Sequence, residues 1–286
     1  MNKKKIILAK LFDLLKINEL FFFLRRIFYG NEYIYAINYH NTSLKDIQQF
    51  EKQLNYYSSF FSNVSKKDLD DFLCNGVWNK DKPGLIISFD DGLRNNFDVA
   101  CKILEKYNFT GWFFISVGFV DCEVSQQKKY AKEHSIISLD EYPDNRIAMS
   151  WDEVRYLNSH HVVGCHTMTH HRMIETTSIE KINREIKDSK TLLESKLNSE
   201  IDIFCWVGGE EFAYSKYAAQ AIKDSGYKYS FMTNCCPITK KTNKFQLQRN
   251  NVESNWSLLL VKFVTSGFMD LLYFRKRCKV NKKTSV

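Results

Sequence analysis

A short apolar run that ends in two adjacent aspartates constrains this chain more than any other feature. Residues 85–87 (LII) predict a buried strand, and Asp90, Asp91 and the turn residue Gly92 follow at its carboxyl end. Neighbouring side chains on a strand point to opposite faces, but the twist into a loop can turn both carboxylates toward one cleft. The pattern therefore predicts a strand that delivers paired carboxylates to one site.

Two histidines four residues apart form the second informative stretch. His166 and His170 lie in the run HTMTH, and this spacing places both imidazoles on one side of a helical turn. One carboxylate and two imidazoles are typical of a facial metal site that keeps positions open for water and substrate. Met168 and Thr169 stand between the histidines, so the glutamate base of HExxH metalloproteases is missing. Either stretch alone would suit a solvated turn, but together they favour a hydrolase site with Asp90 as the base.

Strands and helices alternate along most of the chain. This alternation implies a parallel sheet, closed or open, and candidate ligands at the carboxyl ends of strands favour a barrel. Strands are predicted at 32–39, 85–87, 109–117, 162–165, 201–206, 227–232 and 245–248, and helices at 44–61, 66–74, 94–107, 151–159, 179–197, 214–225 and 255–266.

In this order, SFDDG and HTMTH resemble the first two motifs of the polysaccharide deacetylases, the nodulation-type carbohydrate esterases of family four. The resemblance covers roughly residues 34–266. It implies an α/β fold, an irregular (β/α)7 barrel, and hydrolysis of an N-acetyl group from an amino sugar in a glycan, such as a bacterial surface polysaccharide, or in its precursor. It also implies that Asp90 is the general base and that Asp91, His166 and His170 bind a divalent metal, with zinc expected.

The third motif of that family departs from its usual form. Residues 204–209 read FCWVGG where the family has Phe-Arg-Pro-Pro-Tyr-Gly, so Cys205 replaces the arginine that braces the catalytic aspartate. Arg249 is the candidate for the missing brace, and the alternative is a surface cation. The resemblance implies that Gly208 offers a backbone N–H to the oxyanion, and Trp206 is expected to contact the sugar.

The family's general acid, a histidine in a C-terminal Leu-x-His, is also missing, because no histidine follows His171. Branches that deacetylate poly-N-acetylglucosamine are circularly permuted and carry this histidine near the start, in a Tyr-His pair. Tyr39 and His40 stand in that place, after a predicted strand. We expect His40 to be the general acid. The alternative is a capping or surface histidine, which would make His171 the next candidate.

Charge is unevenly distributed along the chain, whose net charge is +8. Residues 1–30 carry seven Lys/Arg and two acids, residues 271–286 carry six and no acid, and the rest carries 28 basic and 31 acidic residues. A nearly neutral body argues against nucleic acid as a partner. We expect a basic amphipathic segment at 1–30, a catalytic domain at 31–270 and a basic tail at 271–286. The basic ends suit an anionic membrane surface or simply solvent.

The first 26 residues imitate a signal peptide, but Lys10, Asp13, Lys16 and Glu19 interrupt the apolar run. These polar residues recur at every third position and predict one amphipathic helix, which packs on the barrel or lies in a membrane interface. The eight cysteines include no CxxC pair and suit a reducing cytosol. We therefore expect a cytoplasmic protein that is held peripherally at the inner face of the membrane and acts on a lipid-linked or nucleotide-linked sugar.

Two other functions remain open from the sequence. A deacylase of a small N-acyl metabolite would use the same chemistry on another substrate. A catalytically inactive carbohydrate-binding relative would be a different class of protein, and the presence of Asp90, Asp91, His166 and His170 argues against it.

Overall fold

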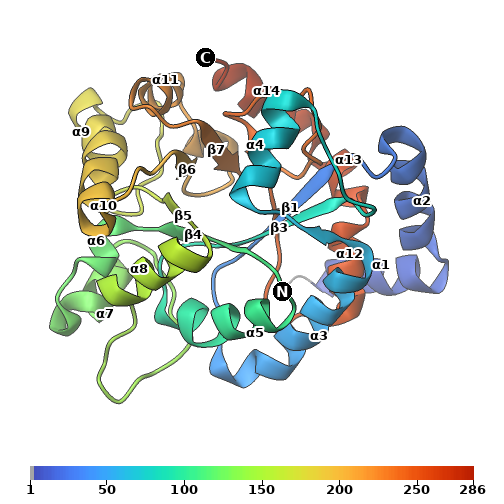
Figure 1. The fold of residues 1–286 in the computed structure, drawn as a ribbon, viewed down its shortest axis with the longest axis horizontal. Helices are drawn as coiled ribbons and strands as arrows, with labels where there is room; N and C mark the ends of the chain where they lie inside the picture. Colours follow the sequence, from blue (N-terminus) through green and yellow to red (C-terminus); the bar gives the residue numbers. More distant parts are fainter. Residues whose placement is uncertain (1–2) are drawn as a thin grey trace.

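Parallel strands form a nearly closed barrel in the computed structural model, which describes residues 3–286, and helices surround it (Figure 1). The strands are β1 (Ile34–Tyr39), β2 (Ser62–Asn63), β3 (Gly84–Phe89), β4 (Gly111–Ile115), β5 (Val162–Cys165), β6 (Ile203–Cys205), β7 (Tyr229–Met232), β8 (Leu247–Gln248) and β9 (Asn250–Asn251). The α-helices are α1 (Lys3–Leu14), α2 (Ile17–Tyr29), α3 (Ile47–Phe60), α4 (Lys66–Asn75), α5 (Lys102–Lys106), α6 (Val117–Val120), α7 (Val124–Glu133), α8 (Trp151–His160), α9 (Ile179–Asn183), α10 (Ser189–Leu197), α11 (Lys216–Asp224), α12 (Leu258–Thr265), α13 (Phe268–Leu272) and α14 (Phe274–Lys283).

The barrel closes through the segment that contains β8 and β9. The strand order is β8-β7-β6-β5-β4-β3-β1-β9, and only Arg249 separates β8 from β9. The Arg249 N–H donates to the Met232 carbonyl of β7 at 2.9 Å, while Asn250 and Asn251 pair with β1. With β8 and β9 counted as one strand, seven strands form the ring and β2 pairs outside it with β3. The expected seven-stranded (β/α) barrel is confirmed.

Alternation along the strands separates an inner from an outer apolar layer. Ile86, Trp112, Phe114 and Phe231 fill the barrel interior, where Gly164 leaves room for the ring of Phe114. A Cβ atom at position 164 would lie 2.8 Å from that ring. Away from the carboxyl ends of the strands, the interior is therefore packed with apolar side chains. Polar groups gather at the carboxyl ends.

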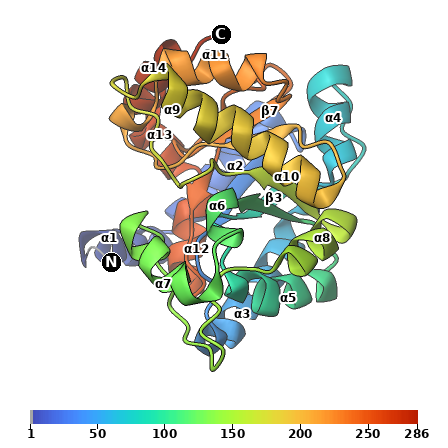
Figure 2. The ribbon, with the colours of Figure 1, turned by 90° about the vertical axis from the view of Figure 1, so that its left-hand side faces the viewer.

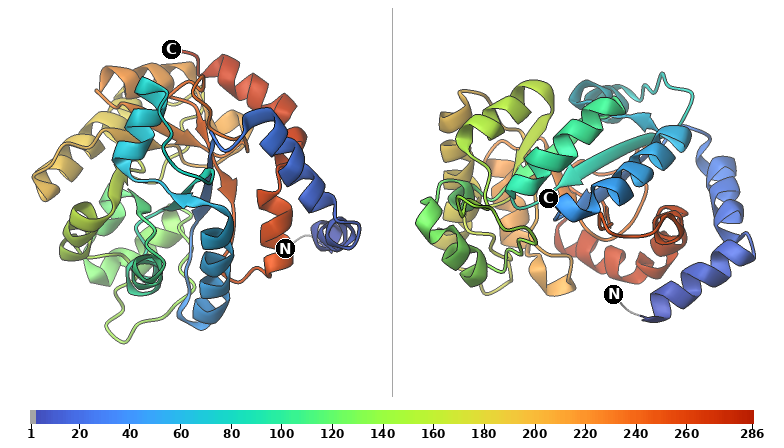
Figure 3. Two further views of the ribbon diagram at one scale, coloured as in Figure 1. Left: turned by 45° about the vertical axis from the view of Figure 1, so that its right-hand side comes forward. Right: turned by 90° about the horizontal axis from the view of Figure 1, so that it is seen from below.

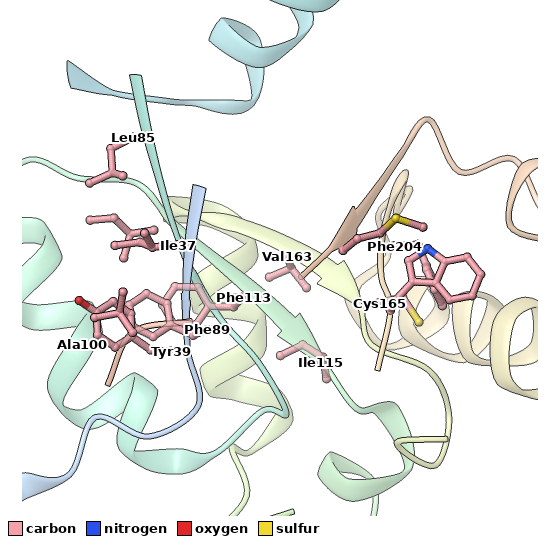
Figure 4. Close-up of a cluster of buried hydrophobic side chains, with 14 of the residues drawn as sticks. Ile37, Tyr39, Leu85, Phe89, Ala100, Phe113, Ile115, Val163, Cys165 and Phe204 are labelled. Carbon is pink, nitrogen blue, oxygen red and sulfur yellow. The ribbon is translucent and has the colours of Figure 1, made fainter. Parts of the chain in front are cut away.

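The outer faces of the strands pack against the helices. Figure 4 shows part of this layer, in which Tyr39, Phe89 and Phe113 lie close together. The Phe89 ring stacks on Tyr39 at 5.6 Å and on Phe113 at 4.9 Å between centroids. Figure 2 shows α9 and α10 running along one side of the barrel, joined by a π-helical turn at Arg184–Asp188.

The N-terminal segment forms two helices rather than the single amphipathic helix predicted from its sequence. Lys16 adopts a left-handed conformation (φ 53°) between α1 and α2. This bend brings Phe12 of α1 and Phe21 of α2 against the same ring, Phe268 of α13, at 4.7 and 5.7 Å. Both views in Figure 3 place α1 and α2 at the periphery beside α12.

Only one side of the α1–α2 pair packs on the rest of the molecule. Ala9 and Phe12 are buried, whereas the side chains of Ile7, Leu14 and Phe28 are 67, 78 and 77% exposed. No helix in residues 3–286 combines the length and apolar character needed to cross a bilayer. The basic residues at the other end of the chain lie in α14, a helix whose Val280 is fully buried.

A buried ion pair joins α2 to α13. Arg25 donates to Asp270 at 2.7 Å and to the Thr265 carbonyl at 3.0 Å, and it lies over the ring of Tyr35. The side chains of Arg25 and Asp270 are 4 and 14% exposed. Removal of one partner therefore leaves a charge buried without compensation.

We predict that Arg25→Ala lowers the free energy of unfolding by about 3 kcal/mol, because Asp270 loses its cation in a buried setting. Denaturant unfolding measures this change. The matched control is Arg26→Ala, at an exposed neighbouring position, which should change stability by less than about 0.5 kcal/mol. Equal effects of the two substitutions would show that the pair does not hold α2 in place.

Candidate active site

The carboxyl ends of four strands bring the candidate residues together. Asp90 follows β3, His166 follows β5, His40 follows β1, and Arg249 lies between β8 and β9. Because β1 and β3 are paired with Tyr39 opposite Phe89, His40 and Asp90 leave the barrel side by side. The site therefore lies at the end of the barrel where parallel strands deliver polar groups.

A left-handed residue explains how two adjacent aspartates serve one site. The Asp90 N–H donates to the Tyr39 carbonyl at 2.9 Å and so continues the strand pairing. Asp91 then adopts φ 77°, which few non-glycine residues do, and Gly92 follows with φ 82°. This turn directs Asp91 to the side that Asp90 already faces. Such strained backbone is common at functional sites.

Asp91, His166 and His170 form a compact cluster with the character of a metal site. Asp91 Oδ1 lies 3.5 Å from Nε2 of His166 and 3.2 Å from Nε2 of His170. One ligand atom from each residue falls within 4.8 Å of the other two. His170 reaches this position because it too adopts a left-handed conformation (φ 53°).

Backbone carbonyls orient both imidazoles. Nδ1 of His166 lies 2.9 Å from the Cys205 carbonyl, and Nδ1 of His170 lies 2.7 Å from the His134 carbonyl. With Nδ1 as the donor, each Nε2 presents its lone pair to Asp91. Metal-binding histidines usually have this second hydrogen bond.

The donor set fits a divalent metal ion. The Asp91 Oδ1 atom is buried and has no hydrogen-bond partner among the described residues, although it faces two imidazole nitrogens. Burial lowers the pKa of His166 to about 4, so this ring is neutral and able to bind a metal. For Asp91, burial favours the neutral form, but the facing His170 outweighs burial and lowers the pKa of the carboxyl. Burial disfavours the charged form of His170, but Asp91 outweighs burial and raises the pKa of this ring, so a metal ion would take the place of its proton. One carboxylate and two imidazoles leave open positions, as catalytic zinc sites do.

Arg249 holds Asp90 through both carboxylate oxygens. Its guanidinium donates to Oδ1 at 2.6 Å and to Oδ2 at 2.9 Å, and it also donates to Ser88 and to Cys205 Sγ. Arg249 is fully buried. The sequence suggested either a brace or a surface cation at this position, and the geometry is that of a brace.

This ion pair keeps Asp90 ionised inside the protein. Burial alone would raise the pKa of the Asp90 carboxyl, but the attraction of Arg249 outweighs burial and lowers the pKa. Asn38 adds a hydrogen bond to Oδ2 at 3.3 Å. The carboxylate next to the metal cluster is therefore charged at neutral pH and held in one orientation.

His40 lies at the rim of the same site. It is partly exposed, and its backbone carbonyl accepts a hydrogen bond from Asn96 at 3.1 Å. His40 is close enough to Asp90 and Asp91 to contribute to the lowering of both carboxyl pKa values. The structure thus places this distant part of the sequence beside the paired aspartates.

Gly208 and Trp206 occupy different environments. Gly208 lies in the loop after β6 with φ 82°, a conformation that favours glycine. Trp206 is 1% exposed, packs on Tyr214, and its indole N–H donates to Ser230. Because Cys205 faces the barrel interior, its neighbour Trp206 points to the helices. Trp206 is thus a core residue and has no exposed face for the predicted contact with the sugar.

One residue that supports the site was not identified from the sequence. Glu185, which is fully buried, accepts hydrogen bonds from the N–H and hydroxyl of Thr169, and Lys181 lies 2.7 Å from it. These contacts hold the loop that carries His170. Glu185 lies in the π-helical turn next to the apolar stripe of its helix, and a carboxylate at such a position could have signalled the role.

Comparisons with known proteins agree with this geometry. Residues 78–230 match the family model for polysaccharide deacetylase, which is more than half of the chain. The chain therefore belongs to the polysaccharide deacetylase family, as its two motifs predicted, and the family's activity is the removal of acetyl groups from sugars. A comparison with curated proteins returns no match.

Solved structures share the fold at low sequence identity. The Streptococcus pyogenes deacetylase PplD, in complex with acetate, is 18% identical with a TM-score of 0.63, over 82% of this chain and 98% of that chain. A de-N-acetylase from Aggregatibacter actinomycetemcomitans is 16% identical with a TM-score of 0.63, over 82% and 100%. IcaB from Ammonifex degensii is 14% identical with a TM-score of 0.59, over 84% and 97%. At these identities the likeness concerns the fold.

We predict that zinc binds to the cluster of Asp91, His166 and His170. His170→Ala should weaken zinc binding by more than the ~10–100-fold typical of losing an outer partner of a metal ligand. Metal analysis of purified protein measures the effect, with His160→Ala, at an exposed helix end, as the matched control. Full zinc occupancy in His170→Ala would exclude His170 as a ligand.

Proposed function

We propose that this protein is a metal-dependent carbohydrate N-deacetylase that acts on an amino sugar in a glycan or glycan precursor. The observation that supports this proposal most is the pairing of two carboxylates with separate environments. Oδ1 of Asp91 faces two imidazoles and has no hydrogen-bond partner among residues 3–286, whereas Asp90 is held by Arg249. The environment of Asp91 suits a metal ligand, and that of Asp90 suits a proton acceptor.

The metal supplies one part of the chemistry. A divalent ion bound by Asp91, His166 and His170 would acidify a water molecule and polarise the acetamide carbonyl. The remaining steps belong to side chains and backbone groups of this chain.

Asp90 removes a proton from the attacking water. Its ionised state and fixed orientation meet the requirements for a general base. Arg249 donates to both oxygens of Asp90, so it acts as a positioning residue and keeps the carboxylate from rotating. Cys205 is a neutral thiol here, because burial raises its pKa, and it does not compete for the proton.

The tetrahedral oxyanion and the leaving amine need two further groups. We assign the backbone N–H of Gly208 to the oxyanion, since a preorganised amide dipole favours charge that develops in the transition state. His40 then protonates the departing nitrogen, because imidazole gives up a proton readily near neutral pH. The C–N bond breaks, and acetate and a free amino sugar leave the site.

We predict that Asp90→Asn retains the metal but lowers acetate release by ~10²–10⁴-fold, because the amide cannot accept the proton. Acetate release from N-acetylated sugars and metal content are measured on the same samples. Asp152→Asn, at a side chain that is 90% exposed, is the matched control. If Asp90→Asn loses the metal as well as the activity, Asp90 is the metal ligand and Asp91 is the general base.

A second prediction concerns His40. His40→Ala should lower deacetylation of N-acetyl sugars by ~10²-fold or more, because an amine leaves poorly without a proton. The same variant should retain most activity on 4-nitrophenyl acetate, whose leaving group departs as an anion. His160→Ala is the control. If the amide and ester activities fall equally, His40 has a structural role and His171 becomes the candidate acid.

We also propose that the protein is cytoplasmic and lies peripherally at the inner face of the membrane. Exposed apolar side chains on both N-terminal helices, including Ile7, Leu14 and Phe28, support this proposal, as do the basic residues at the two ends of the chain. All eight cysteines are free thiols, which suits a reducing compartment.

The triple change Leu14→Ser, Phe23→Ser and Phe28→Ser tests the membrane proposal. These side chains are more than half exposed, so their replacement should leave the fold intact. Sedimentation with vesicles that contain phosphatidylglycerol should fall by at least ~10-fold. Ile179→Ser, which removes a comparably exposed apolar side chain from α9, is the control. A wild-type protein that stays in the supernatant would contradict the proposal.

A further inference from the structure

A polar cavity lies against β9 and the loop that follows β6. Its volume is about 240 Å³, and its lining includes Gly209, Asn250, Lys5 and Lys276. Gly209 directly follows Gly208, and Asn250 directly follows Arg249. The cavity is thus lined by the two segments that carry Gly208 and Arg249, together with residues of α1 and α14.

Asn250 indicates that the cavity is built to hold a polar ligand. It is fully buried, and neither its amide nitrogen nor its amide oxygen has a hydrogen-bond partner among residues 3–286. An unsatisfied buried amide costs roughly 1–3 kcal/mol, so such a group in a native protein requires an explanation. A ligand that accepts from Nδ2 would satisfy the donor half of this amide.

Two lysines give the cavity a positive character. Lys5 extends over the ring of Trp256 and Lys276 over the ring of Tyr273, with Nζ 4.3 and 4.9 Å from the centroids. In the described part of the chain, neither ammonium group lies within 4.0 Å of a carboxylate. Burial lowers the pKa of both lysines more than the nearby acids raise it.

Acids lie near these lysines, with Glu253 close to Lys5 and Glu210 and Glu211 close to Lys276, but within residues 3–286 none forms an ion pair with them. Glu210 lines the cavity, but its carboxylate is engaged by Arg172 at 3.4 Å and by the Gly209 N–H at 3.1 Å. Glu253 is within electrostatic reach of both Lys5 and His40. Glu253 therefore also shows that the lysine side of the cavity and the catalytic rim are neighbours.

We propose that Lys5, Lys276 and Asn250 bind a phosphate group carried by the sugar substrate. This inference rests on the proposed deacetylase function and specifies its substrate class as a phosphate-bearing N-acetyl sugar. Two ammonium groups suit the double charge of a phosphate better than the single charge of a uronic acid carboxylate. The phosphate would anchor the substrate while its acetamide lies at the aspartates.

Calorimetric titration with glucose 1-phosphate tests the site without catalysis. Lys5→Gln and Lys276→Gln should each weaken binding about tenfold, the effect of losing one charge-assisted hydrogen bond. Lys276→Arg should retain most of the affinity. Lys10→Gln on α1 and Lys282→Gln on α14 remove the same charge from exposed positions of the same helices and should leave binding unchanged.

Four binding results would overturn the proposal. The first is the absence of binding to the wild-type protein, and the second is equal weakening in the control variants. The third is binding of glucuronate as tight as that of glucose 1-phosphate. The fourth is equal binding of glucose 1-phosphate to the lysine variants and the wild type, which would mean that only the catalytic metal holds the anion.

Acetate release separates this inference from the deacetylase function. The wild-type protein should release acetate from N-acetylglucosamine 1-phosphate at least ~10-fold faster than from N-acetylglucosamine at low concentration, and Lys276→Gln should reduce this ratio toward one. If neither sugar releases acetate, the proposed function fails for these sugars while the titration still decides the phosphate site. An unchanged ratio in Lys276→Gln would overturn the phosphate site alone.

Discussion

The ion pair between Arg249 and Asp90 is the interaction on which both the barrel and its site depend. Arg249 sits where the ring of strands closes, and its fully buried guanidinium reaches across the interior to a carboxylate at the end of β3. A single buried charge would cost several kcal/mol, so each partner makes the other tolerable. Barrel closure and the charge of the proposed base are therefore coupled. The family's usual arginine at position 205 could be replaced by cysteine because a cation enters from another strand.

Backbone conformation does as much for the site as the side chains. Asp91 and His170 reach the cluster only because both adopt left-handed φ values. Carbonyl groups of Cys205 and His134 orient the two imidazoles, and Glu185 ties down the loop between β5 and α9. These supports come from elements far apart in the sequence. Since local strain is tolerated only where surrounding contacts determine the structure, the packed barrel is what allows such a geometry.

The sequence predicted the seven-stranded barrel, because apolar runs alternate with helical periodicity and polar residues follow the strands. It also predicted that Asp90, Asp91, His166 and His170 would lie together at the carboxyl end of the barrel. It could not predict supports that depend on tertiary contacts, such as the His134 carbonyl, nor the bend at Lys16 that divides the N-terminal segment. Trp206 was predicted to contact the sugar but lies in the helix layer. Side chains alternate along the strand, so Trp206 faces the opposite way from the inward-facing Cys205.

The position at which β8 and β9 close the barrel affects the order in which the protein folds on the ribosome. Strand β1 emerges from the ribosome long before its partner β9, which lies at Asn250–Asn251. Until that segment appears, β1 and β7 present open edges, and Asp90 sits inside the nascent sheet without its counter-ion. Open edges and an unpaired charge both disfavour a finished structure. Translation of Arg249 and β9 thus controls when a competent site first exists, and chains that stop before this segment cannot retain a partly working one.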